Sequence, residues 1–304
     1  MQYPLISEYV QAICNAKDNL DELSYLEPVM DDHNEPLHSS GAFAVVFKMM
    51  DSSTGELYAL KCFTDDQKGR EESYAKISEE LEAINSEYLI GVTYYDKELF
   101  VDSACTIETE FPVLLMDWVD GETMEAYVSE NYKDQNKMKW LAYRFCKMSG
   151  WLHSQTFAHG DIKPDNIMVR PDGTLVLIDY DGMYTPSMTG MKSPTLGSRD
   201  LSHPLRTFDD FNEAMDDFSM TTISLSLKAI SLDPNLYTQY KTADGLLLGM
   251  KDYLNLGKSK MMELLCQYMS DSDLCKLYGN FLLAYSQKDL SLHSFRNFLI
   301  SRPS

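Results

Sequence analysis

The stretch that decides the fold reads HGDIKPDN at positions 159–166 and is followed by LVLID at positions 175–179. It holds two carboxylates and an amide, Asp161, Asp179 and Asn166. Phosphoryl transfer from a nucleotide needs a carboxylate that orients the acceptor hydroxyl and hard oxygen ligands for Mg²⁺, and these side chains can supply both. Each residue alone could simply cap a turn or end a strand, so only their joint occurrence at this spacing points to the chemistry.

The same stretch resembles two motifs of the eukaryotic-like serine/threonine protein kinases, a family of bacterial as well as eukaryotic type. The family's catalytic loop reads H-R-D-L-K-x-x-N and its metal-binding motif D-F-G, where this chain has HGDIKPDN and DYD. The resemblance implies that Asp161 orients the substrate hydroxyl or accepts its proton, and that Lys163 steadies the transferring phosphoryl group. Asn166 would complete the catalytic set and bind Mg²⁺ together with Asp179, and ATP would be the phosphoryl donor.

A glycine-poor version of the family's phosphate loop stands at SSGAFAVV, residues 39–46. Gly41 lies at the middle glycine of that motif, and Ser39 and Ala44 stand where the family usually has the outer two. Small residues let backbone N–H groups approach a phosphate, although the Cβ of Ala44 disfavours a positive φ. Val46 would press on the adenine, but it also fits a strand as an ordinary apolar residue.

The sequence YALK at residues 58–61 resembles the family's V-A-I-K strand. The resemblance implies that Ala59 lies beside the nucleotide and that Lys61 reaches its α- and β-phosphates. A lysine on an apolar strand usually faces solvent, but its place between the phosphate loop and the next helix favours the binding role. Three acidic residues of that helix could supply the glutamate that pairs with this lysine: Glu72, Glu79 and Glu80.

The apolar run VLLMDWVDG at residues 113–121 resembles the strand and hinge behind the adenine. By that resemblance Met116 is the gatekeeper, and the backbone of Asp117 and of Val119 bonds the adenine edge. An edge strand followed by a turn would have the same sequence. Further along, Asp216 opens a segment that resembles the start of the family's central helix, where its carboxylate would accept backbone N–H groups of the catalytic loop.

The motifs also depart from the family pattern. Gly160 stands where most regulated protein kinases have arginine, so no guanidinium is present there to bind a phosphorylated activation segment, and activity is predicted not to need that phosphorylation. Asp181 replaces the usual glycine of D-F-G. The pattern H-G-D with a following I-D-x-D also resembles aminoglycoside and choline phosphotransferases, whereas Lys163-Pro164 and the long segment at 180–215 favour serine or threonine of a protein substrate. A pseudokinase or nucleotide-binding interaction module is the third alternative.

Together with the resemblance, the apolar patterns along the chain predict an α+β, bilobal fold. A helical extension at residues 1–34 precedes a β-rich N-lobe at 35–119 and a helical C-lobe at 120–304. The elements expected before residue 120 are helices within 3–26, strands at 42–50, 57–63, 88–95 and 111–119, and a helix at 67–85. Those expected after it are a helix that ends near residue 153, strands at 167–169 and 175–178, and helices from 216 onwards.

The composition limits the partners. The 304 residues include 26 Lys and Arg against 47 Asp and Glu, and the formal charge of −21 excludes a nucleic-acid binder. A solvated surface is the ordinary explanation for this charge, but it would also steer a basic protein substrate. No run of about 18 apolar residues and no signal-peptide pattern is present, so we expect a cytoplasmic protein without a membrane partner. The six cysteines form no C-x-x-C pair and are predicted to be free thiols.

Overall fold

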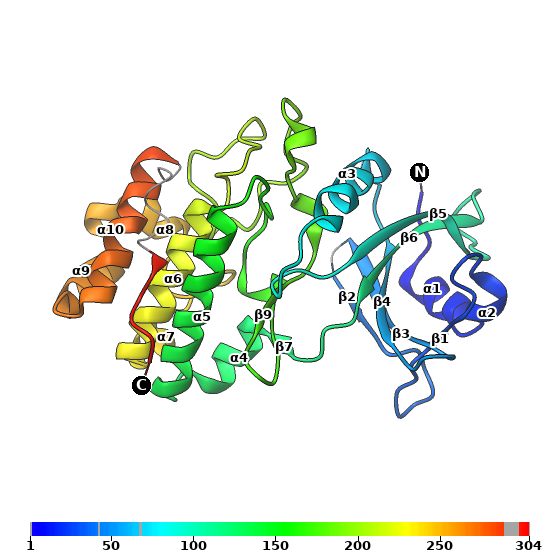
Figure 1. Ribbon diagram of the computed structural model, residues 1–304, viewed down its shortest axis with the longest axis horizontal. Coiled ribbons are helices and arrows are strands. Elements are labelled where there is room, and N and C mark those ends of the chain that lie inside the picture. Colours follow the sequence, from blue (N-terminus) through cyan, green and yellow to red (C-terminus); the bar gives the residue numbers. More distant parts are fainter. Residues whose placement is uncertain (1, 42, 67–68, 289–297, 304) are drawn as a thin grey trace. The chain divides into compact units, whose positions relative to one another are not determined.

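The computed structural model describes the chain except for residues 1, 42, 67–68, 289–297 and 304. The chain divides into two compact units, whose elements are labelled in Figure 1. Unit 1 consists of Met1–Asn85 and Ile90–Val119, and unit 2 consists of Ser86–Leu89 and Asp120–Ser304. Unit 1 is built around a sheet and unit 2 is mainly helical, so the predicted α+β class is confirmed.

Unit 1 contains a six-stranded antiparallel sheet with the strand order β1-β3-β4-β6-β5, in which β2 pairs with β3. The strands are β1 (Leu26–Pro28), β2 (His38–Ser40), β3 (Ala44–Asp51), β4 (Leu57–Phe63), β5 (Val92–Phe100) and β6 (Glu110–Asp117). Gly55 closes the turn between β3 and β4: its N–H donates to the Asp51 carbonyl at 2.8 Å, and its φ of +78° suits glycine. The predicted strands at 42–50, 57–63 and 111–119 are thereby confirmed, with shifts at their ends.

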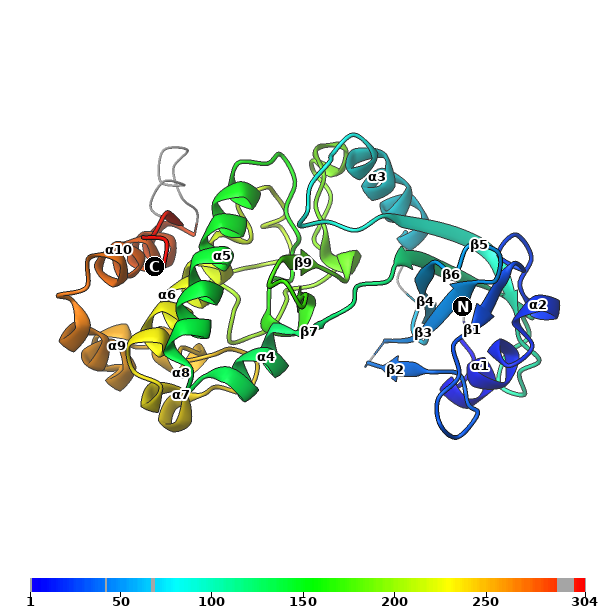
Figure 2. The same ribbon diagram turned by 60° about the horizontal axis from the view of Figure 1, so that its bottom comes forward.

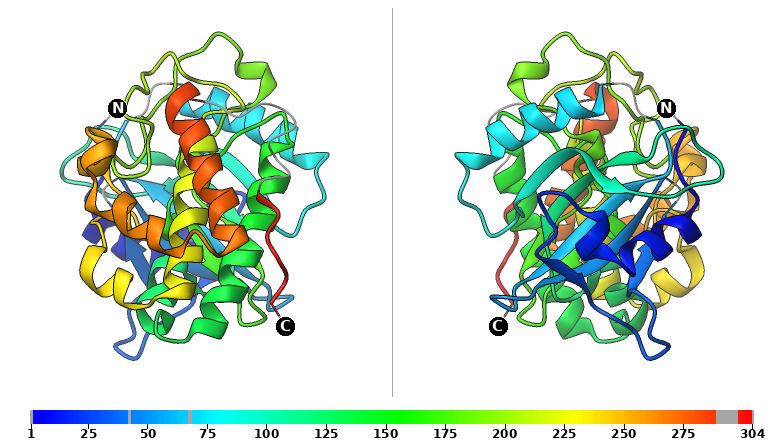
Figure 3. Two further views of the ribbon diagram at one scale, coloured as in Figure 1. Left: turned by 90° about the vertical axis from the view of Figure 1, so that its left-hand side faces the viewer. Right: turned by 90° about the vertical axis from the view of Figure 1, so that its right-hand side faces the viewer.

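One face of this sheet is covered by the N-terminal segment. Helices α1 (Ile6–Ile13) and α2 (Ala16–Asn19) lie against it, as Figure 2 and the right-hand view of Figure 3 show. The shared core joins apolar residues of this segment to alternate residues of the strands: Tyr9, Ile13, Leu20, Leu23, Val45, Phe47, Met49, Leu60, Cys62, Val113 and Leu115. The segment at 1–34, which the sequence marks as a helical extension, thus contributes residues between 3 and 26 to the core of unit 1, and it also contains strand β1; residue 1 lies outside the described residues.

Helix α3 (Arg70–Glu82) packs on β5. Its buried residues Tyr74, Ile77 and Leu81 recur at steps of three and four, the spacing from which a helix is predicted here. Tyr74 stacks on Tyr94 of β5 with 6.2 Å between the ring centroids. The helix is shorter than the predicted 67–85, and residues 67–68 lie outside the described part of the chain.

The predicted strand at 88–95 is wrong in its first half. Strand β5 begins only at Val92, because Ser86–Leu89 belong to unit 2. There the Tyr88 carbonyl accepts the N–H of Leu177 at 2.8 Å, and the Tyr88 ring packs against Trp151 with 5.1 Å between centroids. An apolar residue that packs within unit 2 in this way has the same sequence signature as one within a strand.

Unit 2 is built around helix α6 (Asp217–Leu232), in which every residue from Asp217 to Ser231 is buried. Helices α5 (Gln135–His153) and α10 (Ser272–Gln287) pack beside it, as Figure 1 and the left-hand view of Figure 3 show. The other helices are α4 (Met124–Asn131), α7 (Asn235–Tyr240), α8 (Met250–Tyr253) and α9 (Lys260–Leu265). None of the helices in the described ranges combines the length and apolar character needed to cross a membrane.

A small antiparallel sheet of unit 2 carries the predicted hairpin. Its strands are β7 (Glu122–Thr123), β8 (Ile167–Val169) and β9 (Leu175–Leu177), in the order β7-β8-β9. Gly173 forms the turn between β8 and β9 with a φ of +81°. Short 3₁₀ segments flank the hairpin: η1 (Pro164–Asn166), η2 (Tyr180–Gly182) and η3 (Pro186–Met188).

Candidate active site

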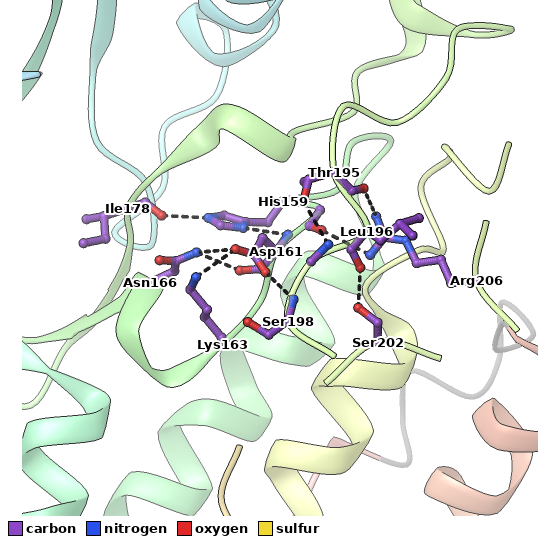
Figure 4. A network of polar contacts seen from close by, with 12 residues as sticks. His159, Asp161, Lys163, Asn166, Ile178, Thr195, Leu196, Ser198, Ser202 and Arg206 are labelled. Carbon is purple, nitrogen blue, oxygen red and sulfur yellow. Dashed lines mark hydrogen bonds and ion pairs between the residues drawn. The ribbon is translucent and has the colours of Figure 1, made fainter. Parts of the chain in front are cut away.

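The three predicted catalytic residues meet around one carboxylate in the loop between α5 and β8. Lys163 Nζ lies 3.1 Å from Asp161 Oδ2. Asn166 Nδ2 donates to the same oxygen at 3.2 Å and to the Asp161 carbonyl at 2.9 Å. The backbone N–H of Ser198 donates to the other oxygen, Oδ1, at 3.1 Å. Figure 4 shows these side chains converging on Asp161.

These contacts hold the Asp161 carboxylate in one orientation without closing it off. Its side chain remains 19 % exposed and that of Lys163 26 % exposed. N–H groups and an ammonium compensate the negative charge of this carboxylate, and its exposed part is open to a hydroxyl. The Lys163 ammonium lies on the same side and can compensate negative charge that develops beside the carboxylate.

Asp179 is placed by the hairpin. It follows β9 with a φ of +67°, an uncommon conformation for a residue with a Cβ, and such strained positions concentrate at functional sites. The preceding residue, Ile178, donates its N–H to the Asn166 carbonyl at 3.0 Å. Its carbonyl lies 2.8 Å from His159 Nε2. The backbone therefore sets Asp179 beside the loop that carries Asn166, and His159 braces that loop.

Two residues at the hairpin carry oxygen donors of the kind that a hard divalent cation prefers. Asn166 turns its amino group to Asp161, so its amide oxygen faces away from that residue (Figure 4). With the Asp179 carboxylate it offers the kind of ligand that Mg²⁺ prefers. Among the described residues, no group of three His, Cys, Asp or Glu side chains could hold a metal alone. This pair would therefore share the ion with phosphate oxygens and water, as Mg²⁺ sites commonly do.

A buried aspartate binds the backbone of the catalytic loop. Asp216, at the start of α6, accepts the N–H of His159 at 2.5 Å and that of Gly160 at 2.9 Å. Burial raises the pKa of its carboxyl, while the charges of His159 and Arg206 and the two N–H groups act in the opposite direction. The predicted acceptance of catalytic-loop N–H groups by Asp216 is confirmed.

Gly160 is required by the backbone. Its φ is +86°, and a Cβ there would lie 1.9 Å from the carbonyl oxygen of Gly182. No residue with a side chain fits without moving the segment at 182. The sequence shows only that the family's arginine is missing at position 160. The structure adds that a side chain at this position would overlap the Gly182 carbonyl.

Arg206, which lies further along the chain, brings a guanidinium group to Gly160. Arg206 Nη1 donates to the Gly160 carbonyl at 3.2 Å. Arg206 Nη2 lies 3.4 Å from Ser193 Oγ and 3.5 Å from the Thr195 carbonyl (Figure 4). Burial lowers the pKa of Arg206, and the carboxylates of Asp216 and Asp161 oppose that shift. Sequence reasoning missed Arg206 and Ser198, because neither belongs to a motif and only folding brings them to Asp161.

In unit 1, the backbone register places four residues predicted to contact the nucleotide on one face of the sheet. Val46 of β3 pairs with Lys61 of β4, and Ala59 of β4 pairs with Met116 of β6. Paired residues, and residues two apart on a strand, point to the same face. These side chains therefore lie together on the face opposite to the one that α1 and α2 cover.

The described residues of the predicted phosphate loop join the same face, while residue 42 lies outside the described part of the chain. Ser39 pairs with Val46, and the Gly41 N–H donates to the Ala44 carbonyl at 2.9 Å. Ala44 begins β3 with a negative φ, so its Cβ introduces no strain. A Cβ at Gly41 would meet only the Ala44 oxygen, at 4.0 Å. The structure thus brings together the loop residues that the sequence singles out.

Lys61 is buried, with 6 % of its surface exposed. Its Nζ lies 5.9 Å from the centroid of the Phe63 ring, over which the Arg70 guanidinium lies at 3.9 Å. Among the glutamates proposed to pair with it, Glu72 instead contacts Lys76 at 2.7 Å on the exposed side of α3.

The hinge residues lie at the end of unit 1. The Asp117 side chain is turned to Gly91, whose N–H donates to Oδ2 at 2.8 Å. Val119 is buried and is the last residue of the unit. The Asp117 carboxylate thus has a structural partner, which leaves the predicted role of this residue to its backbone.

The comparisons with known proteins agree with this geometry. Residues 38–196 match the family model described as the protein kinase domain. The chain is 26 % identical over 143 residues to the probable serine/threonine-protein kinase RTK1 of Saccharomyces cerevisiae, which covers 47 % of this chain and 22 % of that protein. It is 27 % identical over 140 residues to serine/threonine-protein kinase PAK 1 of Mus musculus, covering 46 % and 24 %.

A probable serine/threonine-protein kinase of Clostridium acetobutylicum is 28 % identical over 144 residues, covering 46 % of this chain and 20 % of that protein. The chain spans only about a fifth to a quarter of the length of these relatives. The matched region holds both the sheet face of unit 1 and the loop and hairpin of unit 2. The chain belongs to the protein kinase domain family.

Proposed function

We propose that the chain transfers the terminal phosphoryl group of ATP, with Mg²⁺, to serine or threonine hydroxyls of proteins. The observation that carries this proposal is the Asp161 carboxylate, which Lys163, Asn166 and the Ser198 N–H hold in one orientation. A carboxylate held in this way can orient an acceptor hydroxyl for in-line attack and accept its proton.

Each of the other site residues has a task in this proposal. Lys163 balances the charge of the transferring group, and Lys61 contacts the α- and β-phosphates on the sheet face of unit 1. Asn166 and Asp179 hold Mg²⁺, which neutralises the phosphate oxygens when bound. Val46, Ala59 and Met116 supply the apolar surface for the adenine, while the remaining binding residues act through their backbone: Ser39, Gly41, Ala44, Asp117 and Val119.

A protein substrate is favoured over a small molecule by the segment between Asp179 and Asp216. This segment contributes the Ser198 N–H to Asp161, so it lies beside the acceptor position rather than away from it. The relatives named above are all serine/threonine-protein kinases by description. Both points support recognition of an extended polypeptide next to the catalytic loop.

A basic substrate is favoured by carboxylates around the loop. Burial raises the pKa of Asp165, and the negative charges of Glu125 and Asp244 raise it further. Lys241 pairs with Glu125 and offsets part of this negative charge. Cationic side chains of a substrate would relieve the remaining repulsion.

Activity without phosphorylation of the 182–206 segment is supported by Arg206. A phosphorylated residue usually orders such a segment through an arginine of the catalytic loop. Here Arg206 links Gly160 to Ser193 and Thr195 directly. The segment is thus tied to the loop by a charge that the chain carries permanently.

The test is incubation with labelled ATP and Mg²⁺ in the presence of basic and acidic proteins, amino alcohols and aminoglycosides. We expect label on serine and threonine of the basic proteins. Asp161→Asn should lower the rate by about 10²–10⁴-fold, while the exposed-surface control Glu263→Gln leaves it unchanged. If label appeared on the small molecules instead, the substrate would be a small molecule and not a protein. If no acceptor were labelled although ATP still bound, the chain would be a non-catalytic module. Full turnover of Asp161→Asn would refute the assigned role.

A further inference from the structure

A second site lies in unit 2, outside the catalytic loop and the hairpin end that carries Asp179. It is a cavity of about 270 Å³ between α5, the start of β9, residues 87–88 and the C-terminal segment. Three cationic side chains line it, Arg144, Lys147 and Arg302. No predicted catalytic or nucleotide-binding residue belongs to its walls.

The three cations form no ion pair with the residues that the structure describes. In the part of the chain that the structure describes, no salt bridge joins any of them to a carboxylate, whereas Lys228 and Lys241 are paired with acidic partners. This contrast is notable in a protein with a net charge of −21, where acidic partners are abundant. Several positive charges around one cavity attract an anion.

Two carboxylates lie near this cavity. Glu87 is part of its wall. The pKa of Asp172 is lowered first by hydrogen bonds from Thr174 and further by the charges of Arg144 and Arg170. Asp172 is outside the lining, so Glu87 is the carboxylate that an anionic ligand would meet.

Both arginines lie near one aromatic ring. The Arg144 guanidinium lies 5.6 Å and the Arg302 guanidinium 5.5 Å from the centroid of Trp140. Tyr143 contacts the same indole edge-on, with 5.9 Å between centroids. A cation–π contact leaves the N–H groups of a guanidinium available for hydrogen bonds.

The turn of the hairpin makes room for Arg144. A Cβ at Gly173 would lie 1.3 Å from Arg144 Nη1, so the guanidinium occupies space that exists only because residue 173 is glycine. This glycine thus allows the guanidinium to lie at the wall of the cavity.

We propose that this cavity binds a phosphorylated side chain of a protein. A phosphate carries about two negative charges and accepts paired hydrogen bonds from arginine, whereas a carboxylate carries only one. The volume is below the roughly 300–1,000 Å³ typical of pockets for drug-sized ligands, which suits one residue rather than a nucleotide. The net charge repels polyanions, and Trp140 and Tyr143 supply apolar walls for the stem of the residue.

The experiment measures binding of fluorescent peptides to the full chain by anisotropy without nucleotide, so its result is independent of any phosphoryl transfer. The same peptide is used with phosphotyrosine, phosphoserine, glutamate or the unmodified residue at its centre, and inorganic phosphate is the competitor. We expect the phosphorylated peptides to bind at least about tenfold more tightly than the unmodified one, and this preference to weaken with added salt.

The variants assign the binding to this cavity. Arg144→Gln and Arg302→Gln should each weaken phosphopeptide binding about tenfold or more, while Glu87→Gln strengthens it by removing the repelling carboxylate. Lys139→Gln, an exposed lysine of α5 outside the cavity, is the matched control and should change nothing. Because Arg144 also packs on Gly173, unfolding temperatures are recorded, and Arg302→Gln provides the test if Arg144→Gln unfolds. The proposal would be overturned if the unmodified peptide bound as tightly as the phosphorylated ones, or if inorganic phosphate bound but no phosphopeptide did. It would also be overturned if Arg302→Gln left the affinity for the phosphopeptides unchanged.

Discussion

At the scale of single residues, Gly160 and Gly190 form a natural pair for comparison. Both have a positive φ, +86° and +87°, but a Cβ at Gly160 would collide with the Gly182 oxygen, while one at Gly190 would meet nothing within 4 Å. The two positions therefore separate backbone strain from steric overlap.

We expect Gly160→Ala to lower the unfolding temperature of unit 2 by several degrees more than Gly190→Ala does. Strain alone costs of order 1–3 kcal/mol at either position, and the overlap adds to it only at Gly160. Differential scanning calorimetry of both variants measures the difference. Equal losses would mean that the segment at 182 moves aside without resistance, contrary to its close packing on the loop.

The raised pKa of Asp165 predicts how the binding of a basic peptide depends on pH. Because burial and neighbouring carboxylates raise its pKa, it becomes protonated at a higher pH than an ordinary aspartate as the solution is acidified. Protonation removes a negative charge, so binding of a lysine- and arginine-rich peptide should weaken as the pH falls through that pKa. Anisotropy titrations across the acidic range measure the effect.

Asp165→Asn should bind the basic peptide less tightly at neutral pH and should flatten this pH dependence. A peptide of the same length without basic residues serves as the control, because its affinity should not follow the Asp165 charge. If the variant retained the full pH dependence, another group would be responsible.

At the scale of elements, the 182–206 segment is held by Arg206. We expect Arg206→Gln to increase protease cleavage within this segment and to lower kcat/KM for a protein substrate by at least about tenfold, with the KM for ATP unchanged. The contacts that are lost tie the segment to the Gly160 carbonyl of the catalytic loop and to Thr195. Arg199→Gln, which removes an exposed arginine of the same segment, is the matched control.

Hydroxyls of the same segment sort into two groups. Ser193 and Thr195 are engaged within the segment, since Ser193 Oγ donates to the Thr195 carbonyl at 2.6 Å and Thr195 Oγ1 accepts the Gly197 N–H at 3.0 Å. Ser187 and Thr189 are exposed, although they too are hydrogen-bonded in the segment: Ser187 Oγ lies 2.9 Å from Thr185 Oγ1, and Thr189 Oγ1 donates to the Pro186 carbonyl at 2.7 Å. Alanine at both exposed positions should leave turnover unchanged if phosphorylation of the segment is dispensable, and a large loss would contradict that proposal.

The sequence predicted the elements that depend on local signals. The run at 57–63 and the PDG turn mark β4 and the hairpin, because a short run of apolar and aromatic residues and a tight turn are signals that act over a few residues. The Asp161, Lys163 and Asn166 group was predictable because its members lie in one loop. Tyr88, Ser198 and Arg206 were not, since their roles arise from contacts with residues far away along the chain.

At the scale of the whole molecule, the N-terminal helices complete the core of unit 1. Ile13 is fully buried against the sheet, whereas Leu5 at the start of α1 is 55 % exposed. Ile13→Ala should lower the free energy of unfolding by about 2–5 kcal/mol, while Leu5→Ala has little effect. Chemical denaturation of the two variants compares them. Similar small effects would mean that the helices pack only loosely on the sheet.

Because the N-terminal helices cover that sheet, they limit which fragments of the protein can be produced in folded form. A recombinant fragment that contains only the matched residues, 38–196, would lack the two helices that cover the apolar face of the sheet. It would also lack Asp216, which binds the backbone of the catalytic loop. Such a fragment is expected to collect in inclusion bodies, even though it carries the whole stretch that matches the family model.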